Sequence, residues 1–262
     1  MLLAALYRQY TLNPMQYIYA SMGVRITPLE EGDPECDLIR AYCLNTASSP
    51  AGGSVGVKRI KIFKIERKGE PERFEKVAAE VGNRKLLFHG SGISNFLGLL
   101  AQGMRIAPPE APTTGFMFGK GCYFADMMQK SLQYSTGVKS KLLLLCDVAL
   151  GKTKNLHRAT YIENLEKQFQ SVKGCGQYGP DFKTKKLVAP QGYSVPMGPA
   201  MTYPEPSKEV IDRHQASINA TNPNATTFGA PAFGGGFGGG FGGGFGGGFG
   251  GGFGGFGRGF NQ

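Results

Sequence analysis

Cysteine is scarce in this 262-residue sequence, and long hydrophobic runs are missing from it. The five cysteines are odd in number and show neither a CxxC pair nor the Cys/His spacing of zinc ligands, so we expect reduced thiols and no bound metal. Apolar runs such as residues 142–146 fall far short of the roughly 20 residues that a membrane-spanning helix needs. The first residues also lack the charged start of a secretory signal, so we expect an intracellular protein without a membrane span.

Ionisable side chains are nearly absent after residue 227, where Arg258 is the only one. The net charge of +10 therefore lies almost wholly in the body of the chain. The same C-terminal stretch holds 20 of the 41 glycines, and from Phe233 it repeats Phe-Gly-Gly-Gly with a period of four. Glycine this dense cannot recover its ordering entropy, so we predict a disordered tail over 228–262. Its phenylalanines are either weak multivalent contact points for partners or part of an inert extension.

The body shows alternating helix and strand patterns. Residues 57–66 interleave isoleucine with lysine and arginine, which predicts a half-buried strand. Phe74, Val77 and Val81 recur at helical spacing and predict a short surface helix. Residues 141–151 form the most apolar run, which predicts a strand in the centre of a sheet. Upstream, residues 1–30 are weakly helical, residues 38–44 predict one short element, and the polar stretch 152–191 is expected to be rich in loops.

A compact apolar run, Lys85-Leu-Leu-Phe-His-Gly-Ser, predicts a buried strand that stops at His89 and Gly90. Apolar residues then return at i, i+3, i+4 and i+7 from Ile93, which predicts a helix with Ser91 as its N-cap and Gly103 as its stop. His89 is therefore expected at a strand-to-helix junction. A histidine there is more often structural than catalytic, so its position alone decides nothing.

A loop rich in proline and glycine, residues 105–121, precedes a second candidate segment. Asp126 is predicted to cap a helix over 127–134, on which Ser131 and Tyr134 share a face and Lys130 neighbours Tyr134. A histidine at a strand end, a long loop and a tyrosine-bearing helix would together line a cleft with two aromatic faces. Such a cleft suits a flat heteroaromatic ring that carries a polar amide.

The run Leu86-Leu-Phe-His-Gly-Ser, then Asn95-Phe96, then the stretch from Gly103 through Gly121-Cys-Tyr-Phe-Ala-Asp resembles the catalytic domain of poly(ADP-ribose) polymerases. The likeness extends over roughly residues 25–200, through Ser171-Val-Lys-Gly and Val195-Pro-Met-Gly. It implies an α+β fold with the split β-sheet of ADP-ribosyltransferases. It also implies NAD as co-substrate, transfer of ADP-ribose to acceptor proteins and release of nicotinamide.

The resemblance also assigns roles to residues. His89 and Tyr123 would be the first two members of the family's His-Tyr-Glu catalytic set, with His89 on a ribose hydroxyl. The Gly90 backbone and the Ser131 hydroxyl would hold the nicotinamide amide, and the ring of Tyr134 would stack on the nicotinamide. The loop of residues 106–120 would lie over NAD, the ADP-ribose donor. The remaining positions implied to bind NAD are Ser91, Asn95, Arg105 and Lys130.

The third member of that set, a glutamate on a late strand reading Asn-Glu-Tyr-x-Val-Tyr, is not seen here, nor is the apolar strand that follows it. Glu205 and Glu209 are the nearby carboxylates, but Glu205 lies between two prolines, which disfavour a central strand. Glu209 would start a short helix with Val210, Ile211 and His214. We therefore expect mono-transfer or weakened activity, and a sheet edge left open.

The expected organisation is a short segment over 1–27, at most a remnant of a helical regulatory region, a catalytic domain over 28–200, an unmatched linker over 201–227 and the tail. The alternative is an inactive NAD or ADP-ribose binding module with an interaction tail of the Phe-Gly type. A nucleic-acid or pore-associated scaffold would rest only on the positive charge and the tail. Direct activation by DNA is not evident, and a nuclear or nucleocytoplasmic location is expected.

Overall fold

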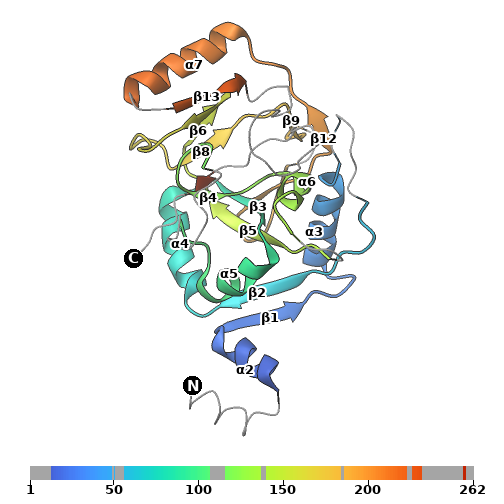
Figure 1. Cartoon of the computed structure of the whole chain (residues 1–262). Coiled ribbons are helices and arrows are strands. Elements are labelled where there is room, and N and C mark those ends of the chain that lie inside the picture. The colour runs from blue at the N-terminus through green and yellow to red at the C-terminus, as the bar shows by residue number, and fades with distance from the viewer. Residues whose placement is uncertain are drawn as a thin grey trace.

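The structure is a computed structural model that describes residues 13–48, 50, 56–106, 116–136, 140–183, 186–222, 226–231 and 256–257 (Figure 1). Most of the 106–120 loop and most of the tail lie outside these residues, so the expectations about them stay predictions. The helices are α2 Pro14–Ser21, α3 Pro34–Asn45, α4 Glu70–Val81, the 3-10 turn η1 Ile93–Asn95, α5 Phe96–Gln102, α6 Met128–Leu132 and α7 Lys208–Thr221. The strands are β1 Val24–Pro28, β2 Phe63–Arg67, β3 Arg84–Gly90, β4 Cys122–Tyr123, β5 Leu143–Ala149, β6 Thr153–Leu156, β7 Arg158–Tyr161, β8 Ser171–Gly174, β9 Tyr178–Pro180, β10 Lys186–Val188, β11 Ser194–Pro196, β12 Ala200–Thr202, β13 Thr226–Pro231 and β14 Phe256–Gly257.

The central sheet has the order β10-β11-β3-β5 and carries the predicted strand that ends at His89. β3 runs antiparallel to β5 along its whole length, with His89 opposite Leu144 and Gly90 opposite Leu143. The prediction that residues 141–151 form a central strand is wrong, because β5 is the last strand of this sheet among the residues that the structure describes. The strand is apolar because both of its faces pack against hydrophobic clusters. Leu143 and Leu145 pack on one cluster, and Cys146 and Val148 on another.

Helix α3 covers one face of the central sheet and confirms the element predicted at 38–44. Asp33 caps it, since the Asp33 carboxylate accepts a hydrogen bond from the Glu35 N–H at 2.8 Å. Its Tyr42 is fully buried and packs on Phe88 of β3 with ring centroids 4.5 Å apart. The same cluster takes in Leu86, Met128 and Leu132, so α3, β3 and α6 share one core.

The elements around β1 and β2 show where local patterns succeed and fail. The helix predicted around Phe74 is α4. The strand predicted over 57–66 is shorter, Phe63–Arg67. Four of its five residues are exposed, and among the residues that the structure describes β1 alone pairs with it. Gly103 does end α5, in a left-handed conformation. Ser91 is not the predicted N-cap: the segment starts with η1, whose N-cap is Gly92, so that the Ser91 hydroxyl instead accepts from the Asn95 amide at 2.9 Å.

The polar stretch 152–191, expected to be loops, holds short strands. β6 pairs in parallel with β8, β9 pairs with β12, and β7 pairs with β13. These pairs are separate two-stranded sheets, and α7 lies over β6, β8 and β13 at the end of the molecule away from α2 (Figure 1). The helix expected to start at Glu209 is confirmed as α7. Within the predicted tail the structure describes the end of β13, and β14, which pairs with β4.

The fold class is α+β, as expected, built from several small sheets and short helices. All five cysteines are free thiols. In the described part of the chain, no helix has the length and hydrophobicity to cross a membrane. Over the same residues, no group of three or more His, Cys, Asp or Glu side chains is arranged to hold a metal ion.

Candidate active site

His89 lies near the end of β3, where its side chain is tied to the neighbouring strand. Its Nδ1 lies 2.8 Å from the main-chain oxygen of Tyr123, and its ring meets Phe124 edge-on at 6.0 Å. Because a carbonyl can only accept, Nδ1 carries the proton and Nε2 keeps a free lone pair. Burial lowers the pKa of His89, and the bond to Tyr123 opposes that shift only in part. The imidazole is therefore neutral at pH 7 and presents an acceptor.

Gly90 packs directly against the backbone of α6. A Cβ atom at this position would lie 1.9 Å from the main-chain oxygen of Ser131, far inside van der Waals contact. Ser131 is buried, and its hydroxyl donates to the Phe88 carbonyl at 3.1 Å. Only glycine permits this approach of strand to helix, so β3 and α6 form one rigid corner beside His89.

Tyr123 joins the site through its main chain and anchors a loop through its side chain. Its hydroxyl donates to the Gly119 carbonyl at 2.8 Å and lies 3.3 Å from the donating N–H of Phe118. Burial raises the pKa of this phenol well above its usual range. Tyr123 is therefore neutral, and it connects His89 to the end of the loop that precedes β4.

Lys130 and Tyr134 pair as the i, i+4 spacing predicts. The ammonium of Lys130 lies 5.6 Å from the ring centroid of Tyr134, within range of a cation–π contact. Lys130 is buried, and that burial lowers its pKa to about 8. The Tyr134 side chain is 54% exposed, so part of its ring remains open for stacking.

The other three residues predicted to bind NAD lie in or beside the segment formed by η1 and α5. Ser91 and Asn95 are hydrogen-bonded to each other, which fixes both at the start of that segment. Arg105 follows α5, is exposed, and its guanidinium donates to the Gln102 side chain at 3.2 Å. The structure thus joins Ser91 to Asn95, and holds Arg105 at the other end of α5.

Residues that the sequence did not single out hold this corner together. The Tyr42 hydroxyl lies 3.2 Å from the Leu86 carbonyl and 3.1 Å from that of Asp126, so it ties β3 to the start of α6. The Thr46 hydroxyl accepts from the Met128 N–H at 3.1 Å and so provides the side-chain cap that Met127, the N-cap residue of α6, does not. The sequence signal for them was weak, because a tyrosine inside a short predicted element and a threonine after it form no motif.

Asp126 is not the N-cap of α6, because Met127 occupies that position and makes no side-chain cap bond. The Asp126 carboxylate turns instead into the core, where Oδ2 lies 3.4 Å from the ammonium of Lys173. Its Oδ1 is buried and finds no hydrogen-bond partner among the residues that the structure describes. Both side chains line a cavity of about 240 Å³ that Lys85 and Leu87 of β3 also reach.

Two carboxylates were candidates for the missing glutamate. Glu205 is exposed between β12 and α7. Glu209 lies in the first turn of α7, where it accepts from Arg213 at 2.7 Å and both side chains are largely exposed. α7 lies over β6, β8 and β13 rather than over α6 (Figure 1). Each glutamate is therefore in the environment of a solvated surface side chain.

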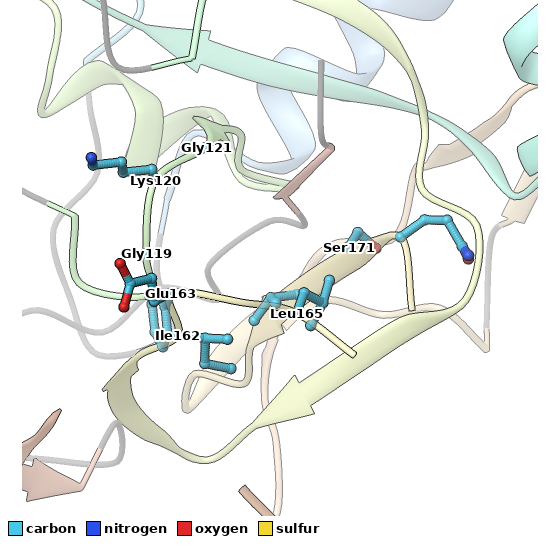
Figure 2. Close-up of a pocket in the computed structure, with 10 residues that line it drawn as sticks. Gly119, Lys120, Gly121, Ile162, Glu163, Leu165 and Ser171 are labelled. Atoms are coloured by element: carbon cyan, nitrogen blue, oxygen red, sulfur yellow. The ribbon is translucent and has the colours of Figure 1, made fainter. Parts of the chain in front are cut away.

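A small pocket lies behind Tyr123, between the loop at Gly119 and Gly121 and the residues that follow β7. Figure 2 shows Ile162, Glu163, Leu165 and Ser171 around it. Its volume of about 40 Å³ accommodates only a few water molecules. It is therefore not a dinucleotide site.

Comparison with known proteins agrees with the resemblance seen in the sequence. The family model for the poly(ADP-ribose) polymerase catalytic domain matches residues 34–215. Poly [ADP-ribose] polymerase 2-A of Oryza sativa subsp. japonica is 46% identical over 200 residues, which cover 75% of this chain and 30% of that protein. Poly [ADP-ribose] polymerase of Drosophila melanogaster is 41% identical over 193 residues, 72% of this chain and 19% of that protein. Poly [ADP-ribose] polymerase 1 of Gallus gallus is 41% identical over 189 residues, 71% and 18% respectively.

The chain thus spans less than a third of the length of these relatives. The matched range ends inside α7, later than the expected end near residue 200. It contains His89, Tyr123, Ser131 and Tyr134, the residues whose geometry is given above. The chain belongs to the poly(ADP-ribose) polymerase catalytic domain family.

Proposed function

We propose that this chain is an NAD-dependent ADP-ribosyltransferase that transfers ADP-ribose from NAD to protein side chains and releases nicotinamide. The observation that carries the proposal is the corner formed by His89, Gly90 and Ser131. There a neutral imidazole with an open Nε2 adjoins a strand that touches a helix through a glycine. Membership of the family supplies the reaction class.

The residues fit a dinucleotide whose reactive end has a hydroxylated ribose and a flat amide-bearing ring. Nε2 of His89 would accept a hydrogen bond from a ribose hydroxyl. The Ser131 hydroxyl gives its proton to Phe88, so its lone pairs would accept from the amide nitrogen. The half-exposed ring of Tyr134 would stack on the flat ring, with Lys130 behind it. Ser91, Asn95 and Arg105 would serve the adenosine end.

Cleavage of the glycosidic bond builds positive charge on the ribose, and a preorganised carboxylate stabilises such charge strongly. Neither Glu205 nor Glu209 is in a buried or oriented position. We therefore propose mono-transfer at a reduced rate rather than polymer formation. We also propose the split β-sheet of ADP-ribosyltransferases as the fold, and a nuclear or nucleocytoplasmic location in which the Phe-Gly tail makes weak multivalent contacts.

The test is incubation of the full chain with NAD labelled on the adenosine side, together with two variants. His89→Ala removes the imidazole, and Gly98→Ala alters an exposed helical glycine whose new Cβ would meet no atom within 4 Å. We expect label on protein with the original chain and with Gly98→Ala, and a strong loss with His89→Ala. Equal labelling by all three proteins would refute the assignment of His89.

A second candidate is a binding module without transfer, and the absence of an oriented glutamate at Glu205 or Glu209 favours it. Saturable binding of NAD without label on protein would support this alternative. The length of the product distinguishes mono-transfer from polymer formation. Single ADP-ribose groups on the labelled protein, seen on a denaturing gel, would support mono-transfer. A long polymer ladder would show that another group replaces the glutamate.

A further inference from the structure

Helix α7 packs on the same core as the wall that carries Tyr123. Its buried residues Ile211 and Ile218 are seven positions apart and so share one face. Ile218 belongs to a cluster with Phe118, Leu156, Ile162 and Val172, against which Met117 and Tyr123 also pack. Because Phe118 donates to the Tyr123 hydroxyl, α7 supports the loop that fixes Tyr123 from behind.

The polar contacts that dock α7 are individually weak. Arg158 of β7 meets Asp212 at 3.5 Å, with both side chains partly exposed. Thr160 lies 3.5 Å from Gln215, at the limit of a hydrogen bond. Glu166 takes a shorter bond, 2.6 Å, from Thr221 at the far end of the helix. Exposed ion pairs of this kind contribute little, so the apolar face and the contacts at its centre decide whether α7 stays docked.

At that centre two histidines stack. His157, at the corner between β6 and β7, lies with its ring 5.1 Å from that of His214 on α7, and the planes differ by 22°. His214 falls between Ile211 and Ile218 on the helix. Burial lowers the pKa of His157, and the charge of a protonated His214 would lower it further. Stacked imidazoles are compatible when neutral, whereas two imidazolium rings at this distance repel each other.

The charged groups around the pair are already engaged with one another. On β7 and α7, Arg158 pairs with Asp212, and on the outer side of α7 Arg213 pairs with Glu209. On β6, Lys154 pairs with Glu166, which also accepts from Thr221. Each of these cations on β6, β7 and α7 thus has an anion beside it. Carboxylates, lysine and arginine change their charge little between pH 5 and 8, whereas the ordinary titration range of imidazole lies there.

We propose that α7 is a positioning element for Tyr123 and that protonation of the His157–His214 pair releases it. His157 has a lower proton affinity docked than released, so docking is complete above the ordinary histidine range near pH 6.5 and weakens as the pH falls below it. Release would remove Ile218 from the cluster and loosen Phe118, and with it the hydroxyl of Tyr123. The effect on catalysis rests on the proposed function, whereas the docking equilibrium does not.

Amide hydrogen exchange tests docking directly, with rates corrected for the intrinsic effect of pH. In the full chain, protection of the α7 amides should fall between pH 7 and pH 5, by up to about tenfold per pH unit for each proton taken up on release. The His157→Phe/His214→Phe variant keeps two stacked rings and cannot titrate there, so its α7 protection should stay constant. Asp212→Asn is the control for the neighbouring ion pair and should keep the pH dependence of the original chain.

Two results would overturn the proposal: constant protection in the original chain, or the same fall in the double Phe variant. Protection in β3 and β5 reports whether each variant is folded. Should the double variant not fold, His157→Gln serves instead, with the same expectation of a flattened profile. The chain has three histidines, so NMR titration of the imidazole signals assigns the pH step to His89 or to the pair.

Transfer from labelled NAD gives the catalytic readout. If α7 positions Tyr123, the activity of the original chain should fall below pH 6.5 for two reasons, protonation of His89 and release of α7. The activity of the double Phe variant should fall only because of His89. A chain that transfers no ADP-ribose at any pH would defeat the proposed function and leave the exchange experiment to decide the docking of α7. An identical dependence of activity on pH in the two proteins would refute the claim that α7 positions Tyr123 for catalysis.

Discussion

The Nδ1 atom of His89 lies 2.8 Å from the main-chain oxygen of Tyr123, so two of the three expected catalytic positions are joined by a contact from the side chain of one to the main chain of the other. The imidazole is thereby fixed in one tautomer, with Nε2 as its acceptor. Replacing His89 with alanine removes this acceptor and leaves the Tyr123 carbonyl unsatisfied. We expect kcat/KM for transfer from NAD to fall by about 10- to 100-fold, the range for one lost buried hydrogen bond. The same variant should lose about 1–3 kcal/mol of stability, measured by thermal unfolding, because the Tyr123 carbonyl is left without its donor.

Gly90→Ala tests the contact between β3 and α6. The new Cβ would lie 1.9 Å from a main-chain oxygen that no rotamer change can move away. We expect a loss of stability of about 1–3 kcal/mol, measured by denaturant unfolding, together with loss of transfer. Gly98→Ala in α5 is the matched control and should stabilise by about 0.5–1 kcal/mol, because its Cβ meets open space. Similar effects of the two substitutions would contradict the close packing at Gly90.

Lys173→Met tests the buried pair with Asp126. It leaves the carboxylate buried without its cation, and we expect a destabilisation of about 1–3 kcal/mol. Asp126→Asn in the same background should recover much of that loss, because the amide carries no charge into the core. Unfolding of the two single variants and the double variant gives the coupling energy. An additive result would show that the 3.4 Å pair makes no net contribution.

The lowered pKa of Lys130 predicts that the stability of the folded chain rises at alkaline pH. Its pKa of about 8 in the folded chain lies below its ordinary value of 10.5. Between these pH values the unfolded chain binds more protons, so stability should rise with pH, by up to about 1.4 kcal/mol per unit. The difference between the original chain and Lys130→Met, measured by urea unfolding from pH 7.5 to 10, isolates this contribution from other groups. A pH-independent difference would mean that Lys130 keeps an ordinary proton affinity.

Local signals predicted the parts of the fold in which one pattern dominates. The apolar run at 85–90 gave β3, the helical spacing around Phe74 gave α4, and Gly103 gave the end of α5. The position of β5 at the end of its sheet was not predictable from the sequence. A strand that is covered on both faces shows the same continuous apolar pattern as a strand that has a neighbour on both edges. The cap of α6 was also missed, since Asp126 has the right residue type but finds Lys173 across the core.

Near the candidate site, sequence patterns placed His89 close to the end of a strand and Lys130 beside Tyr134, since both depend on residues that are close in the sequence. Tyr42 and Thr46 were not found, because their roles depend on α3 packing against segments that begin 40 or more residues later. The stack of His157 on His214 joins residues that no local pattern relates. Contacts between distant segments carry no short-range signature, so they became visible only in the folded chain.

Gly119 faces two separate restrictions, a backbone φ of +105° and a Cβ position only 2.1 Å from the Ile162 carbonyl. Either one alone disfavours every other amino acid. In a library of random substitutions, position 119 should therefore accept glycine alone, although it lies in a loop, while the exposed neighbour Lys120 should accept many residues. The boundary between tolerant and intolerant positions would then fall between two adjacent residues, directly behind Tyr123.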